Sequence, residues 1–354
     1  MWRILETIID HKSSHGNFFL TYKMEHLYII GNGFDKHHWI ESGFDDFGRW
    51  LEENHSSLFY QLVSIYSISD EKEWQQFEHI LGELNVTYQV EEIMEDRRPN
   101  WMSLPDDDRA FNNAKRDYEA APEVARYTFE DLFEEVRYTF VEWINQLNEP
   151  ERKQMITMEK NSTFVTFNYT DTLESLYKIA ANQIIYIHGC AKRGEKLELG
   201  HGKTVEDIQS EYYSQIPEDV DSPEQIEHFY ANANDWVEED TYMEIIQRLA
   251  DQRKPVEDLI GKLNKLLLDN MTDIVHIHIY GFSFSDIDMP YIATIANHIN
   301  RNRVMWEVTY YADDEAMRFC SQLESLGIPK ENILLTTLKD LNRYGRVGHI
   351  FRNN

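Results

Sequence analysis

Four short polar motifs stand out because each directly follows a run of apolar residues. They are GNGFD (31–35), TFNYT (166–170), IHG (187–189) and YGFSFSDID (280–288). Their glycines allow a backbone to approach a phosphate, and their Asn, His, Ser and Asp side chains can hold a ribose or move a proton. Turn chemistry alone explains four such endings poorly, so the pattern predicts a ligand site.

The first motif places two glycines, Gly31 and Gly33, one residue apart. Such a turn either cradles a phosphate with its backbone amides or is a tight strand-to-helix connection that binds nothing. The dinucleotide fingerprint G-x-G-x-x-G would need a third glycine where Lys36 stands. The absence of a Walker A sequence and of a G-x-S-x-G elbow disfavours a P-loop NTPase and an α/β-hydrolase.

Each polar side chain in these motifs has a functional and a structural interpretation. Asn32 could donate its amide to a ligand or tolerate a left-handed turn. Asp35 could hold a ribose or cap the following helix, and Asn168 could act on a ligand or cap the helix after it. His188 titrates near neutrality, so it could act as a base or orient a ribose hydroxyl, or it could be a buried structural histidine.

Two other groups of side chains bear on the chemistry. In HIHIY, His276, His278 and Tyr280 share one strand face, but they precede the strand end and no third ligand is obvious, so we expect no metal. Glu78 interrupts an apolar helix stripe, either as a surface acid or as an inward carboxylate near the site. Asp286 and Asp288 flank a predicted helix start, where carboxylates favour the helix dipole.

The elements that must position these residues follow from the apolar pattern. The predicted strands are 26–31, 163–167, 184–188, 274–280, 304–311 and 333–338. Helical patterns alternate with them, including 71–84 and a long helix at about 124–147, whereas the polar, Pro-containing stretch 96–123 is typical of a crossover. This rhythm predicts an α/β fold with a mainly parallel, Rossmann-like sheet flanked by helices, whose strand ends bring the motifs to one edge.

The chain is expected to form one such domain over 24–354, with helical insertions at about 40–160 and 204–262. Residues 1–23 are expected to be an N-terminal extension, because Met24 stands just before the first strand and the pattern before it is weak. Segment 204–258 carries 16 acidic and only 3 basic residues. We expect this acidic insertion to lie outside the sheet, with a surface that is either simply solvated or serves as a lid or partner surface.

Composition limits the class of protein. The 354 residues are 42% hydrophobic, enough for a sizeable core, and no apolar run approaches the length of a membrane span. The 63 acidic and 34 basic residues give a net charge of −29, which disfavours nucleic acid as a partner. Two cysteines, Cys190 and Cys320, cannot form a disulfide framework or a four-cysteine zinc site, so we expect a cytoplasmic protein.

Taken together, the motifs resemble the AbiH family of bacteriophage abortive-infection proteins. The resemblance is carried by IIGNGFDKHH with SGFDDF, WQQFE, TFNYTDTLESLY, IHG and YGFSFSDIDMPYI, in this order, within about residues 26–340. AbiH proteins are in turn similar, more distantly, to the sirtuin-like NAD-binding fold. The resemblance therefore implies a phage-defence protein with a sirtuin-like sheet that binds NAD or a related nucleotide.

The same resemblance implies roles for particular residues. It makes Asn168 and His188 the catalytic residues. It places around the nucleotide Gly31, Asn32, Gly33, Phe34, Asp35, Thr170, Asp171, Gly189, Gly281 and Ser283. Thr170 stands where the sirtuin pattern has Asp, and the four-cysteine zinc module of protein deacetylases is absent. Cleavage of NAD by water is therefore the implied chemistry, rather than protein deacylation.

Two functions remain open from the sequence. The protein could hydrolyse the nicotinamide–ribose bond of NAD, which would starve an infected cell. Alternatively, it could sense a nucleotide without catalysis and act through a protein partner or a phage trigger, with segment 204–258 as the contact surface. A nuclease is disfavoured, because no cluster of carboxylates for a metal is apparent and the net charge is unfavourable.

Overall fold

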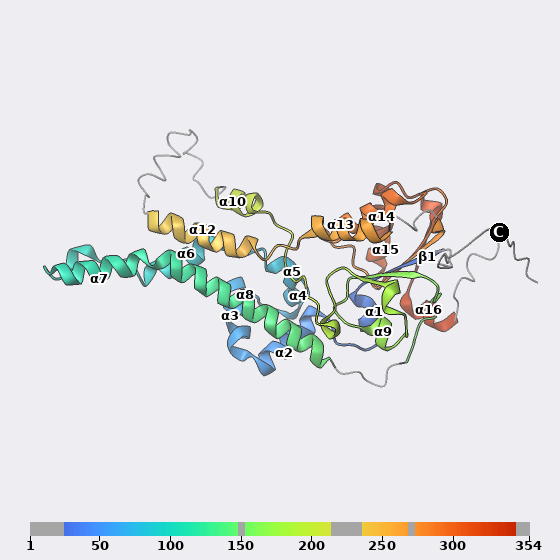
Figure 1. Ribbon diagram of the computed structural model, residues 1–354, viewed down its shortest axis with the longest axis horizontal. Helices are drawn as coiled ribbons and strands as arrows, with labels where there is room; N and C mark the ends of the chain where they lie inside the picture. The colour runs from blue at the N-terminus through green and yellow to red at the C-terminus, as the bar shows by residue number, and fades with distance from the viewer. Residues whose placement is uncertain (1–24, 148–152, 214–235, 268–272, 345–354) are drawn as a thin grey trace, which may run out of the picture.

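The computed structural model describes residues 25–147, 153–213, 236–267 and 273–344. The expected N-terminal extension, 1–23, lies outside the described residues. The described chain forms an α/β sheet domain and a helical arm that extends away from it (Figure 1). We use "arm" for the helices within 44–146 and 205–250.

Six parallel strands form one sheet in the order β3-β2-β1-β4-β5-β6. They are β1 His26–Ile30, β2 Thr163–Thr166, β3 Ile184–Tyr186, β4 His276–Tyr280, β5 Met305–Thr309 and β6 Ile333–Thr336. The expected α/β class and the single parallel sheet are therefore confirmed. The strand order reverses direction between β1 and β4, which is where doubly wound sheets bind their ligands.

Both faces of the sheet are covered by helices, because successive side chains of a strand point to opposite faces. Leu27 and Ile29 of β1 pack in a cluster with α13, α14 and α15, and Tyr28 and Ile30 pack in a second cluster with α1, α9 and α16. These helices are α1 Asn32–His37, α9 Thr172–Ser175, α13 Val256–Leu267, α14 Met289–His298, α15 Asp313–Ser325 and α16 Leu338–Tyr344. Short 3-10 turns are η2 Ala181–Gln183, η3 Ala191–Arg193 and η5 Lys330–Asn332.

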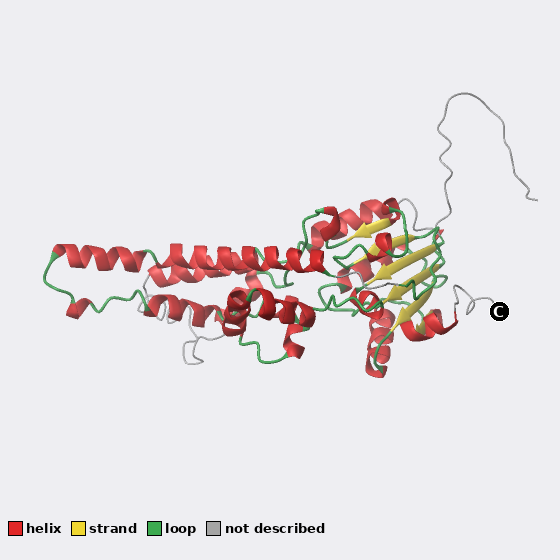
Figure 2. Cartoon of the chain, turned by 90° about the horizontal axis from the view of Figure 1, so that it is seen from below, coloured by secondary structure: helices red, strands yellow, loops and turns green. Residues whose placement is uncertain are grey.

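The arm has its own hydrophobic core, built around the 26-residue helix α8, which is about 39 Å long at 1.5 Å per residue. Its helices run away from the sheet, as Figure 2 shows. They are α2 Phe44–Asn54, α3 Ser56–Tyr66, α4 Glu71–Trp74, α5 Phe77–Ile80, α6 Val86–Glu95, η1 Trp101–Ser103, α7 Asp108–Glu119, α8 Ala121–Gln146, α10 Val205–Tyr213 and α12 Trp236–Ala250. The helical insertions that the sequence predicts are thus present.

Two local predictions for the arm are wrong. The expected crossover at 96–123 contains the twelve-residue helix α7, which begins where the Asp107 side chain accepts from the Arg109 amide. The single helix expected at 71–84 is divided between α4 and α5 at Gln75 and Gln76, and the buried rings of Trp74 and Phe77 stack across the break with centroids 5.2 Å apart.

The described part of segment 204–258 is helical and lies outside the sheet, as expected. Its last residues return to the junction between arm and sheet. Within the described chain, no helix combines the length and apolar character that crossing a membrane requires.

Candidate functional site

The turn after β1 and the turn after β4 lie against each other at the switch point. The Gly31 amide donates to the Tyr280 carbonyl at 3.0 Å. The Gly33 amide donates to the Gly281 carbonyl at 2.8 Å. A Cβ added at Gly281 would lie 2.0 Å from the Phe34 amide nitrogen, and the φ of Gly281, +62°, favours glycine in any case. Close backbone packing therefore requires these glycines even without a ligand.

The other residues of these two turns divide between core and surface. The Asn32 side chain donates to the Ser42 carbonyl at 3.0 Å and accepts from the Ser42 hydroxyl at 2.5 Å. Phe34 is fully buried against the rings of His38 and Tyr177. Ser283 is exposed. Asn32 thus fixes the loop after α1, and Phe34 contributes its ring to the core.

Asp35 and Thr170 are brought together by the fold. The buried Asp35 carboxylate accepts from the Thr170 hydroxyl, which joins the end of β2 to α1. Asp35 does not cap a helix, because it lies inside α1. Asp171 occupies the N-cap position of α9, and Gly189 has a φ of +81°. These residues shape the carboxyl edge of β2 and β3.

His188 follows β3 and is 3% exposed. Its ring contacts the rings of Phe167 and Tyr169, with centroids 5.4 and 5.8 Å away. Its Nε2 lies 3.7 Å from Oδ1 of Asp288 and, among the described residues, has no hydrogen-bond partner. Asp288 Oδ1 likewise has none, whereas its Oδ2 accepts from the Ser285 hydroxyl at 2.8 Å.

Burial dominates the titration of this pair. It lowers the pKa of His188 well below its usual value, the charge of Lys254 lowers it further, and a hydrogen bond with the Phe167 backbone opposes both. Burial raises the pKa of Asp288 to about 6, which Lys254 and the Ser285 hydroxyl counteract and Glu78 reinforces. At neutral pH the imidazole is therefore neutral, and Asp288 is largely ionised with an appreciable protonated fraction.

Glu78 of the arm forms an ion pair with Lys254, which lies between α12 and α13, beside His188 and Asp288. Lys254 is 1% exposed, and its Nζ lies 2.7 Å from Oε1 of Glu78, although the alignment falls short of a regular hydrogen bond. The same oxygen accepts from the Tyr169 hydroxyl at 2.9 Å. Burial and the charge of Glu78 raise the pKa of Tyr169 well above its usual value. Lys254, Glu78 and Tyr169 thus link the arm to the end of β2.

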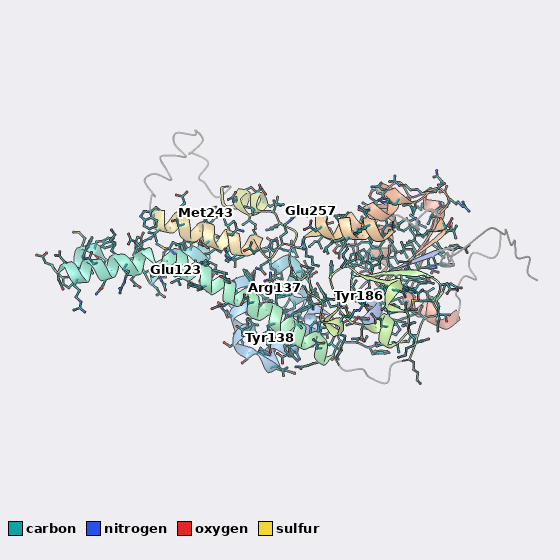
Figure 3. The ribbon with its side chains drawn as sticks, viewed as in Figure 1. Glu123, Arg137, Tyr138, Tyr186, Met243 and Glu257 are labelled. Atoms are coloured by element: carbon teal, nitrogen blue, oxygen red, sulfur yellow. The ribbon has the colours of Figure 1, made fainter. Side chains whose placement is uncertain are left out.

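Hydrogen bonds to the backbone hold Lys254 and the turn that precedes it. Its amide donates to the His201 carbonyl at 2.9 Å. The Arg137 side chain donates to the Asp251 carbonyl at 3.4 Å, from α8. Arg137 of α8 and Glu257 of α13 are labelled near this junction of arm and sheet in Figure 3. Lys254, at this junction, is the only fully buried lysine among the described residues.

Asn168 stands between two residues whose rings contact His188. The backbone amide of Asn168 donates to Thr166 Oγ1 at 3.1 Å. The buried side-chain oxygen, Oδ1, has no hydrogen-bond partner within the described chain. The hydroxyl of Tyr291, whose ring lies 6.3 Å from that of His188, is also buried without one. Buried polar atoms without partners are rare, so this group at one sheet edge marks a candidate site for a polar ligand.

The structure brings only part of the predicted set together, and it adds residues. His188 and Asn168 lie at this edge of the sheet. Of the two interpretations of Glu78, the structure supports the inward carboxylate over the surface acid. Asp288 lies at the start of α14, but its side chain faces His188 and does not cap the helix. No motif or spacing in the sequence marks Lys254, which is one of three basic residues in the acidic segment 204–258.

The histidines of β4 form a separate cluster on the body of the sheet. His278 Nδ1 lies 2.7 Å from Oε2 of Glu307, its Nε2 lies 3.0 Å from Nδ1 of His26, and Tyr280 donates to Glu307 at 2.6 Å. Burial and the two neighbouring histidines lower the pKa of His276 to about 4. Within the described residues, no three His, Cys, Asp or Glu side chains are grouped so as to hold a metal ion.

The sheet order defines a doubly wound α/β protein, and the polar group at its strand ends is a candidate ligand site. The sequence model described as "Bacteriophage abortive infection AbiH" matches residues 27–310, most of the chain. The protein therefore belongs to the AbiH family, which acts in abortive infection against bacteriophage. No match was found among curated proteins or among solved structures. All the site residues described above lie within the matched range.

Proposed function

We propose that this abortive-infection protein binds NAD or a closely related nucleotide at the switch-point edge and hydrolyses its nicotinamide–ribose bond. The observation that supports this most directly is the buried pair of His188 Nε2 and Asp288 Oδ1, 3.7 Å apart and both without a hydrogen-bond partner among the described residues. A neutral imidazole beside a carboxylate suits a reaction that moves one proton from water.

In the proposed reaction, water replaces nicotinamide at the ribose. The bond between ribose C1′ and the nicotinamide nitrogen breaks, and nicotinamide leaves with the electron pair. The oxygen of a water molecule bonds to C1′, and His188 Nε2 accepts the proton that the water loses. Because Nε2 has no partner in the part of the chain that the structure describes, the hydrogen bond with the Phe167 backbone is assigned to Nδ1–H, which leaves Nε2 as an acceptor.

The remaining residues have supporting roles in this proposal. An ionised Asp288 would stabilise the positive charge that develops on the ribose, and Asn168 would position the ribose or the water. The pyrophosphate would lie over the two packed glycine turns, at their outer side, where Asn32 and Ser283 are exposed. The Gly33 amide would stay bonded to the Gly281 carbonyl, so the cradle would be shaped by the turns rather than by this amide.

A nucleotide sensor that acts through a partner is the second candidate. Thr170 stands where the sirtuin pattern has Asp, and its hydroxyl is used to bind Asp35. This contact favours a site that holds the nucleotide without recognising nicotinamide. Binding of NAD without turnover, with or without a phage lysate, would favour this candidate.

The test uses the purified full-length chain. NAD binding is measured by calorimetry, and nicotinamide release is measured by chromatography, in the presence and absence of lysate from infected cells. His188→Gln should lower release by about 10²–10³-fold, as expected for loss of one positioned group at a reacting centre. His298→Gln, an exposed histidine on α14, is the matched control and should leave release unchanged. If no adenine dinucleotide binds to the protein, both candidate functions are rejected.

A further inference from the structure

A concave site lies at the far end of the arm, away from the sheet. A cavity of about 330 Å³ opens between η1, α7 and the start of α12. It is lined by Trp101, Phe111, Lys115, Tyr118, Glu119, Trp236 and Val237. Figure 1 places α7 and the start of α12 at the end of the arm opposite to the sheet. This cavity is therefore separate from the candidate site around His188.

The lining combines a buried floor with exposed aromatic walls. Val237 and Tyr118 are buried, whereas Trp101, Phe111 and Trp236 are 44%, 50% and 55% exposed. The rings of Trp101 and Phe111 have centroids 5.3 Å apart, so they form one continuous wall. Large aromatic side chains left half-exposed around a hollow are typical of protein-binding surfaces.

The floor also carries an unsatisfied polar atom. Tyr118 is 8% exposed, and its hydroxyl is buried with no hydrogen-bond partner among the described residues. A buried phenol normally finds a partner, and leaving it without one costs free energy. A bound polypeptide could supply the missing partner through a backbone carbonyl.

Charge decides which kind of polypeptide fits. Residues 86–147 and 236–250 of the arm carry 19 acidic and 8 basic residues, a net charge of −11. At the cavity itself, Lys115 is paired with Glu119 at 3.7 Å, and nearby Arg98 is paired with Glu238 at 2.6 Å. Lys115 and Arg98 are thus each paired with a carboxylate, and the surplus charge of the arm is acidic.

We propose that this arm-tip groove, defined by the seven lining residues above, docks a basic segment of another protein that also carries apolar side chains. Lysine or arginine side chains would lie over the tryptophan faces and near the surplus carboxylates, while apolar side chains cover Phe111 and Val237. A second copy of this chain fits poorly, because two surfaces of the same sign repel each other. The proposal is independent of any nucleotide chemistry at the sheet.

The test measures binding of a fluorescent amphipathic peptide of leucine and lysine residues to the full-length protein, by anisotropy. The salt concentration is kept at about 0.3 M, so that diffuse attraction to the acidic surface is screened. The peptide should bind, and a peptide with glutamate in place of lysine should not. Replacing both tryptophans, in Trp101→Ala/Trp236→Ala, should weaken binding at least about tenfold, as for an aromatic anchor.

Two further variants separate docking from general stickiness. Tyr118→Phe keeps the ring but removes the hydroxyl, and it should weaken binding by a factor of about 5, the value of one hydrogen bond. Tyr138→Ala is the control, because Tyr138 is 69% exposed on α8 nearer to the sheet (Figure 3) and should leave binding unchanged. Circular dichroism and thermal melting confirm that each variant is folded.

Several results would overturn the proposal. If the glutamate peptide bound equally well, the bound segment would not be selected by its basic charge. If Tyr138→Ala lost as much binding as the tryptophan variant, the groove would not be the binding site. No binding of the leucine–lysine peptide, or unchanged binding by the tryptophan variant, would reject it outright. Concentration-dependent dimerisation that Trp101→Ala/Trp236→Ala abolishes would assign the groove to a second copy instead.

Discussion

His188 Nε2 and Asp288 Oδ1 face each other at 3.7 Å inside the protein, and neither has a hydrogen-bond partner among the described residues. The two residues come from different strand ends, β3 and β4, which lie on either side of β2 and β1 in the sheet. A pair held apart by slightly more than a hydrogen bond suits a bridging hydroxyl or water.

Asp288→Asn should change how stability depends on pH. Unfolded Asp titrates near 3.8 and folded Asp288 near 6, so between these values the folded protein holds a proton that the unfolded chain has released. This contribution to stability is present at low pH and is lost as the pH rises through about 6. Between pH 4 and pH 6 the wild type should therefore lose stability that Asp288→Asn keeps, so the melting temperature of the variant should rise relative to that of the wild type. Above about pH 6 the difference between the two melting temperatures should stay constant.

The exposed neighbour Asp286 provides the control for this measurement. Asp286→Asn removes an exposed carboxylate from the same turn, and its melting temperature is measured at the same pH values for comparison. If the melting temperature of Asp288→Asn differed from that of the wild type by the same amount at every pH, the pKa of Asp288 would not be raised as described.

The buried pair of Lys254 and Glu78 should behave as a unit. Lys254→Met leaves the Glu78 carboxylate buried without its cation and should cost about 3–5 kcal/mol of unfolding free energy. The double variant Lys254→Met/Glu78→Leu removes both charges and should be more stable than Lys254→Met alone. Chemical denaturation of the wild type, both single variants and the double variant gives the coupling energy.

A surface pair supplies the comparison for Lys254. Lys196 and Glu198 lie 3.0 Å apart, with the Lys196 side chain 76% exposed. Lys196→Met should therefore change the unfolding free energy by less than about 1 kcal/mol. Additive effects of Lys254→Met and Glu78→Leu would show that the two residues do not interact as the structure indicates.

The packed turns predict that their glycines support stability as well as any ligand. Gly281→Ala places a Cβ 2.0 Å from the Phe34 amide nitrogen at a φ of +62°, so the variant should melt many degrees lower or fail to fold. Gly33→Ala, which meets the Gly281 backbone at 2.8 Å, should also be destabilised. Calorimetric melting curves report both effects.

Gly261 is a suitable control, because a Cβ there meets nothing within 4 Å and the residue lies in helix α13. Gly261→Ala should be neutral or stabilising by up to about 1 kcal/mol. If Gly33→Ala retained full stability and lost only nucleotide binding, the phosphate-cradle interpretation would be favoured over backbone packing.

The sequence predicted the sheet well because buried parallel strands are continuous apolar runs, as in Leu27–Ile30, and glycine turns mark their ends. It could not predict Lys254, since that residue reaches the site only because α12 packs on α8 in the arm while α13 packs on the sheet. Helix α7 was missed because its apolar stripe is short, with only Phe111, Ala114 and Tyr118 in an otherwise polar stretch. Neither spacing nor composition records which of several acids, such as Glu78 and Asp288, will be buried together.

Asn168→Ala should separate catalysis from folding and binding. Because Asn168 Oδ1 has no hydrogen-bond partner among the described residues, its removal should cost little stability. In the proposed reaction the side chain acts at the ribose, so nicotinamide release should fall by about 10²–10³-fold while the Kd for NAD changes little. Asn145→Ala, an exposed asparagine on α8, should alter neither quantity. A parallel loss of binding and release in Asn168→Ala would instead assign Asn168 to holding the nucleotide.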